Sequence, residues 1–154
     1  KPLTTDAMVS HVDFLPTLAS LAGTPKAARS NWQGKDYSQL VLQPKKSKTV
    51  QDYVVFTYDD VQSGQKSGPY PKAPNHIVSI REERWKLAKY YAVEPKKPTP
   101  PQWEMYDLKE DPEETENLAY KHYKRSPLQE REYQRLKKKL AAVEKTRLKS
   151  PKTS

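Results

Sequence analysis

The chain of 154 residues carries a formal net charge of +9 and no cysteine, and 34% of its residues are hydrophobic. This length corresponds to one domain or part of one, and the composition supports a modest core. Disulfides and thiolate metal sites are excluded, and no run of about 18 apolar residues is present that would predict a membrane-spanning helix.

The first predicted element is a helix over residues 13–22. Asp13 can cap its N-terminus, Pro16 falls in the first turn where its missing N–H is harmless, and Gly23 can end the helix. The apolar residues recur at helical spacing, so we expect them to be buried: Leu15, Leu18, Leu21 and Ala22. A brief second helix is predicted over residues 36–42.

Four segments rich in β-branched and aromatic residues predict strands near residues 53–58, 76–82, 85–91 and 103–107. Their links favour an antiparallel sheet. The first two strands are separated by a long loop over residues 59–75, punctuated by Gly and Pro. Loops of this length inside a compact domain are either functional or disordered.

The last predicted element is a helix that begins at about Pro127, where Ser126 and Gln129 have the spacing of a capping box. Its apolar residues form one narrow stripe, which we expect to pack on the sheet: Tyr133, Leu136, Leu140 and Val143. The predicted fold class is therefore α+β, a small antiparallel sheet of about four strands packed against a C-terminal helix. We expect residues 150–154 to form a frayed tail.

The positive charge is concentrated in the C-terminal segment, where nine basic and three acidic residues fall between Arg125 and Lys149. A basic helix can bind nucleic acid or another anionic polymer. Neither an aromatic platform nor a base-reading motif accompanies these charges. We therefore interpret them as a solvated helix face and expect no nucleic-acid partner.

The most specific signal is the segment after the fourth predicted strand. Locally, Asp111-Pro112 predicts one acidic helical turn with Glu114 at its third position. The segment also matches the phrase Y-D-L-x-x-D-P-x-E-x-x-N-L-A at Tyr106-Asp107-Leu108, Asp111-Pro112, Glu114 and Asn117-Leu118-Ala119. In this respect it resembles the tail of sulfatases of the arylsulfatase and choline-sulfatase type, within the alkaline-phosphatase-like superfamily.

Two further segments carry the same resemblance. Residues 9–23 are similar to the sulfatase phrase V-x-x-x-D-x-x-P-T-x-L-x-L-A-G, and Ile80-Arg81 followed by Trp85-Lys86-Leu87 and Tyr90-Tyr91 resembles the hairpin that precedes the tail. The three phrases occur in family order over about residues 9–119. The resemblance therefore implies the C-terminal subdomain of an α/β sulfatase fold. Residues 1–50 would end the catalytic-domain segment and residues 51–149 would form the C-terminal subdomain.

The resemblance also implies what lies elsewhere. Sulfatases use a formylglycine, made from Cys or Ser in a C/S-x-P-x-R motif, together with a divalent cation, usually calcium. The chain contains no such motif, so we expect both groups in a missing N-terminal catalytic domain and assign no catalytic or metal residue here. The expected partners are that domain and a sulfated small molecule or glycan. The fragment alone is predicted to be inactive, and a periplasmic or secreted location rests on the resemblance alone.

Side chains from this part of a sulfatase can line the substrate pocket, which makes Tyr58, Asp59, His76 and Arg81 candidates for substrate contact. Three of them have an alternative role. Asp59 can cap a loop, His76 can be structural, and Arg81 can pair with Glu104 or Asp107. A long loop punctuated by Pro and Gly is costly to order unless it closes a site or an interface. We therefore predict that the loop over residues 59–75, with cations such as Lys66 near its tip, faces the missing catalytic domain.

Two other functions remain open at this stage. A phosphonate or phosphate monoester hydrolase of the same superfamily shares the tail phrases and differs in its nucleophile motif. A free-standing basic module that binds anionic polymers would show binding that weakens with salt.

Overall fold

The computed structural model describes residues 4–46, 49–59, 74–92 and 100–148, which fall into two compact units, Lys1–Val54 and Val55–Ser154. The predictions for the long loop over residues 59–75 and for the frayed tail fall largely or wholly outside the described residues. Each unit is considered by itself below.

The first unit contains two short 3-10 turns, His11–Asp13 and Lys26–Arg29, and two helices, α1 (Phe14–Leu21) and α2 (Ser38–Leu42). Its centre is the buried carboxylate of Asp13, which is 1% exposed. Asp13 accepts hydrogen bonds from the backbone N–H groups of Ser10 (2.7 Å) and Lys35 (2.6 Å) and from the side chain of Gln51 (2.6 Å). Asp13 thus joins three segments of the unit and does not serve as the side-chain cap of α1.

The apolar face of α1 is not buried as predicted. Leu15 is 58%, Leu18 is 47% and Leu21 is 44% exposed. Within this unit α1 packs on the short α2 through its other residues, and Thr17 Oγ1 accepts from the Tyr37 N–H at 3.0 Å. A five-residue helix covers one side of α1 only, so the prediction of burial was wrong for this unit.

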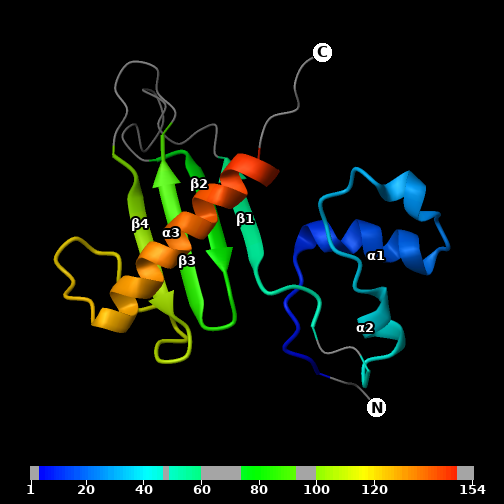
Figure 1. Ribbon diagram of the computed structural model, residues 1–154, viewed down its shortest axis with the longest axis horizontal. Coiled ribbons are helices and arrows are strands. Elements are labelled where there is room, and N and C mark those ends of the chain that lie inside the picture. The colour runs from blue at the N-terminus through cyan, green and yellow to red at the C-terminus, as the bar shows by residue number, and fades with distance from the viewer. Residues whose placement is uncertain (1–3, 47–48, 60–73, 93–99, 149–154) are drawn as a thin grey trace. The chain divides into compact units, whose positions relative to one another are not determined.

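The second unit is built on a four-stranded antiparallel sheet in the order β1-β2-β3-β4 (Figure 1). The strands are β1 (Val54–Asp59), β2 (His76–Arg81), β3 (Trp85–Tyr91) and β4 (Gln102–Asp107). All four lie within one residue of the predicted bounds. In the register, Ile80 is opposite Leu87 and Leu87 is opposite Met105, so the three side chains share one face of the sheet.

Helix α3 (Pro127–Arg147) lies across this face of the sheet (Figure 1). Leu136 and Leu140 are fully buried, as are Ile80, Leu87 and Met105 beneath the helix. Tyr133 and Val143 complete the buried stripe, which confirms the predicted packing. Ser126 and Gln129 form the predicted capping box. The α+β fold class is therefore confirmed.

The segment after β4 follows the edge of that strand. Asn117 Oδ1 accepts from the N–H groups of Met105 (3.1 Å) and Ala119 (2.8 Å), while its Nδ2 donates to Trp103 O (3.1 Å). Leu118 N–H donates to Met105 O at 2.9 Å. The exposed edge of the sheet is thereby paired with a short covering segment, which is a common protection against unwanted strand addition.

The predicted acidic helical turn is a non-helical turn instead. The Asp111 carboxylate accepts from the N–H groups of Thr115 (3.0 Å) and Glu116 (2.9 Å), so Asp111 caps a turn as the sequence suggested. Glu114 has a φ of 56°, which is incompatible with continuation of a right-handed helix. Its carboxylate forms an ion pair with Lys86 at 2.5 Å, which fixes the turn to β3.

Candidate functional site

Two of the predicted candidates meet where β1 ends and β2 begins. Asp59 Oδ1 lies 2.5 Å from His76 Nδ1, although 16 residues separate them in the sequence. The Asp59 side chain is 69% exposed, whereas the His76 side chain is 25% exposed. Asp59 therefore contacts the imidazole with one carboxylate oxygen and presents the rest of the carboxylate to solvent.

Tyr91 at the end of β3 supports the histidine from the side. Its ring is stacked on the imidazole, with centroids 5.2 Å apart and planes inclined by 22°. The residues are direct partners in the register, which explains the contact. Burial raises the pKa of the Tyr91 hydroxyl, and the carboxylates of Glu144 and Asp59 raise it further. The phenol is therefore a neutral hydrogen-bond donor at physiological pH.

Asn75, the residue before His76 in the sequence, has an unsatisfied acceptor. Its Oδ1 atom is buried and has no hydrogen-bond partner in the structure. An unpaired buried acceptor costs on the order of 1–3 kcal/mol, so such atoms call for an explanation. Because successive side chains of an extended segment lie on opposite faces, Asn75 is not grouped with His76. We refer to Asp59, His76 and Tyr91 together as the strand-end cluster.

The other two candidates lie apart from this cluster. Tyr58 is 51% exposed and precedes Asp59 on the strand, so its side chain lies on the opposite face. Arg81 is exposed at the far end of β2, about 16 Å from His76 for five residues of extended chain. The structure brings together Asp59 and His76 and leaves Tyr58 and Arg81 outside.

The alternative roles of these residues are also resolved in part. Arg81 does not take Asp107 as its partner, because Arg84 occupies both oxygens of that carboxylate at 2.8 and 2.7 Å. The Arg84 guanidinium holds the pKa of Asp107 below its ordinary value. Glu104, the other proposed partner, accepts from the Tyr90 hydroxyl at 2.8 Å.

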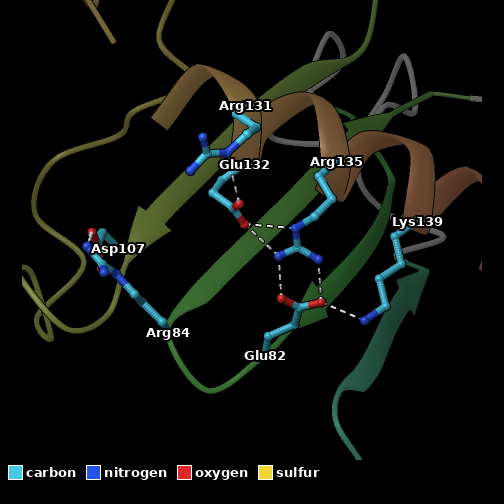
Figure 2. Close-up of polar contacts among 7 residues, drawn as sticks. All are labelled: Glu82, Arg84, Asp107, Arg131, Glu132, Arg135 and Lys139. Atoms are coloured by element: carbon cyan, nitrogen blue, oxygen red, sulfur yellow. Dashed lines mark hydrogen bonds and ion pairs between the residues drawn. The ribbon is translucent and has the colours of Figure 1, made fainter. Parts of the chain in front are cut away.

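The opposite end of the sheet carries an ion-pair network that sequence reasoning missed (Figure 2). Glu82 in the β2–β3 turn accepts from Arg135 at 3.0 and 2.5 Å and from Lys139 at 2.6 Å, and Arg135 also binds Glu132. The hydrogen bond from Arg135 is the largest cause of a lowered pKa at Glu82. In the sequence, the one indication of this network was that Arg135 and Lys139 are one helical turn apart. We interpret this network as a fastening between hairpin and helix.

Two negative observations concern the described part of the chain. No group of three or more His, Asp or Glu side chains in it is placed to hold a metal ion. None of its helices is both long and apolar enough to cross a bilayer.

The fold defined above is that of the C-terminal portion of solved sulfatases. The structure of BT4656 in complex with its substrate D-glucosamine-2-N,6-O-disulfate matches with a TM-score of 0.66 and 24% identity, covering 92% of this chain and 25% of that one. A protein from a Bacteroides thetaiotaomicron locus for metabolism of multiple glycosaminoglycans matches with a TM-score of 0.62 and 21% identity, covering 94% and 28%. A Bacteroides fragilis protein provisionally described as a sulfatase matches with a TM-score of 0.64 and 18% identity. The match covers 92% of this chain and 26% of that one.

At these low sequence identities, the structural matches show a shared fold only. The family is shown by a separate match of the sequence. Residues 1–146 match the family described as N-sulphoglucosamine sulphohydrolase, C-terminal, and the chain belongs to this family. The resemblance read from the three phrases is thereby confirmed. No curated protein matches the chain. The chain spans about a quarter of the length of the solved structures that it resembles.

Proposed function

We propose that the chain is the C-terminal portion of a longer sulfatase that hydrolyses the sulfate esters of a sulfated sugar. The family match over residues 1–146 is the observation that carries this proposal. The disulfated glucosamine bound by BT4656, whose fold this chain shares, supports the sugar class.

The catalytic groups of this reaction belong to the remainder of the enzyme in this proposal. The residues of the chain do not fit a formylglycine, because cysteine and the Ser-x-Pro-x-Arg sequence are both absent. Among the described residues, no cluster of carboxylate or imidazole ligands is placed to hold calcium. We assign no chemical step to this chain and predict that it releases no sulfate by itself.

The contribution of the chain is a substrate contact at the strand-end cluster. The exposed carboxylate of Asp59 is an acceptor for sugar hydroxyl groups. Asp59 and Tyr91 hold the His76 ring in one orientation. Such fixed polar groups position a substrate at low entropic cost. In this role the cluster binds and orients the sugar and takes no part in bond cleavage.

This role is tested in the full-length enzyme with His76→Ala and a matched control, His122→Ala, at an exposed histidine in the segment before α3. In this proposal His76→Ala removes a hydrogen bond between the imidazole and the charged substrate. Loss of one such bond costs about 1.5–3 kcal/mol, so we expect KM to rise by about tenfold or more with His76→Ala. KM should stay unchanged with His122→Ala. Equal kinetics of both variants would reduce the cluster to scaffold.

The proposed reaction class is tested separately by reading the coding sequence upstream of Lys1. A C/S-x-P-x-R motif preceded by a pair of aspartates is expected. A threonine or other nucleophile in its place would favour the phosphonate or phosphate monoester hydrolase.

A further inference from the structure

The solvent face of α3 carries a line of three exposed cations. Arg131, Lys138 and Lys145 follow one another at intervals of seven residues. At about 3.6 residues per turn, they fall within an arc of about 40° and extend over about 21 Å of helix. This arc lies about 180° from the buried stripe centred on Leu136 and Leu140. We call these three residues the outer basic stripe.

The outer basic stripe is not neutralised by the helix. Its three glutamates are committed elsewhere: Glu130 to Arg125 at 2.5 Å, Glu132 to Arg135 at 2.7 Å and Glu144 to Lys89 at 2.7 Å. The nearest acid approaches Arg131 only to 4.0 Å, and the Arg131 side chain is 71% exposed. Figure 2 shows this 4.0 Å ion pair between Arg131 and Glu132, and shows that Arg131 makes no contact with Glu82.

The other cations of the helix contrast with the outer basic stripe. Arg135 and Lys139 bind Glu82, while Lys137 lies over the Trp103 and Tyr133 rings at 4.9 and 5.1 Å. Lys138 and Lys145 are exposed. Between them lie Ala141 and Ala142, whose small side chains leave the lysine ammonium groups protruding. The sequence thus separates cations that hold the fold from cations that project into water.

We propose that the outer basic stripe is a docking surface for a sulfated polysaccharide, distinct from the strand-end cluster. A straight row of ammonium and guanidinium groups complements a linear polymer that carries sulfates on successive sugar units, and the guanidinium of Arg131 can bind a sulfate through two hydrogen bonds. The sulfated class of the polymer rests on the proposed function. Nucleic acid is disfavoured because the one aromatic residue of α3, Tyr133, is buried and cannot serve as a stacking platform beside the stripe.

Binding to the outer basic stripe would hold a polymeric substrate on the enzyme between cleavage events. A second, weak contact on the same polymer raises the effective concentration of further substrate groups near the active site. This increase in effective concentration would apply to long polysaccharides and not to a single sulfated sugar.

The test uses the 154-residue chain and a heparin-type oligosaccharide as probe, with titrations at several salt concentrations. We compare the triple variant Arg131→Gln, Lys138→Gln, Lys145→Gln with the charge-matched control Lys35→Gln, Lys46→Gln, Lys109→Gln, whose lysines are exposed elsewhere. The stripe variant should lose about tenfold in affinity for the oligosaccharide at low salt. The slope of log K against log salt concentration should become shallower by about 2–3. The control should lose less than about twofold. Circular dichroism verifies that both variants fold.

Three results would overturn the proposal. Equal losses in the two triple variants would show that net charge alone drives binding. Undiminished binding of a desulfated probe would show that sulfate is not recognised, and equal binding of an oligonucleotide of the same charge would indicate a nucleic-acid surface. Because the assay measures no turnover, it is independent of the proposed reaction. Stripe-dependent binding in an enzyme that releases no sulfate would refute the proposed function and leave the docking surface standing.

Discussion

Truncation of Leu136 to alanine tests how the second unit is held together. Leu136 is fully buried in the middle of the α3 stripe, over a layer formed by Ile80, Leu87 and Met105. The substitution removes three carbon atoms, which at about 0.8 kcal/mol each corresponds to about 2.4 kcal/mol of lost transfer free energy. The cavity adds to this, so we expect a loss of about 2–4 kcal/mol. Helix propensity contributes almost nothing, since alanine is the best helix former.

The assay is urea unfolding followed by far-UV circular dichroism, with the change read from the midpoint at constant slope. Leu128→Ala serves as the matched control, because Leu128 lies in the first turn of the same helix and is 38% exposed. We expect the control to change the free energy of unfolding by less than about 1 kcal/mol. If Leu136→Ala is no more destabilising than Leu128→Ala, α3 does not pack on the sheet as described.

Four further outcomes are expected. Asn117→Ala, compared with exposed Asn31→Ala, should destabilise the second unit by about 2–3 kcal/mol, because two backbone N–H groups and one carbonyl lose their partner; equal urea midpoints would contradict this. The pKa of Glu82 is held below its ordinary 4.5 by the Arg135 hydrogen bond, so its stabilisation is complete above about pH 4.5 and is lost as the pH falls through the lowered pKa. Glu82→Gln should accordingly flatten the acid limb of the stability profile, and an unchanged limb would exclude this carboxylate as its source. The isolated chain should release no sulfate from aryl or sugar sulfates with or without calcium, and turnover above a buffer blank would overturn the division of roles. In the full-length enzyme, Arg81→Ala should leave KM close to the wild-type value, because exposed Arg81 lies at the other end of β2 from His76; a rise in KM equal to that of His76→Ala would contradict a contact confined to the strand-end cluster.

The sheet and the last helix could be predicted from the sequence because their signals are local. Runs such as Trp85–Tyr91 combine β-branched or aromatic residues with short links, and the α3 stripe has helical spacing over several turns. The family was recognisable because Asp13, Asp107, Asp111 and Asn117 hold turns and edges together through specific hydrogen bonds. Each of these hydrogen bonds needs that type of side chain, so the residue types can be recognised as a sequence motif.

The sequence-based predictions failed at features that depend on tertiary contacts. The leucines of α1 have the pattern of a buried face, but periodicity cannot say what covers it. Arg84 was overlooked as the partner of Asp107 because the choice between Arg81 and Arg84 depends on the hairpin register, in which Trp85 is opposite Asp107. For the site, the proximity of Asp59 and His76 follows from strand pairing, whereas the stacking of Tyr91 on His76 depends on the register of β2 and β3.

The most direct measurement is sulfate release by the full-length enzyme on a sulfated glucosamine, compared with the phosphate monoester of the same sugar under identical conditions. The proposed function predicts catalytic turnover of the sulfated sugar that exceeds turnover of the phosphate monoester. Preferential release of phosphate, with no sulfate above the blank, would contradict the central claim that this chain completes a sulfatase.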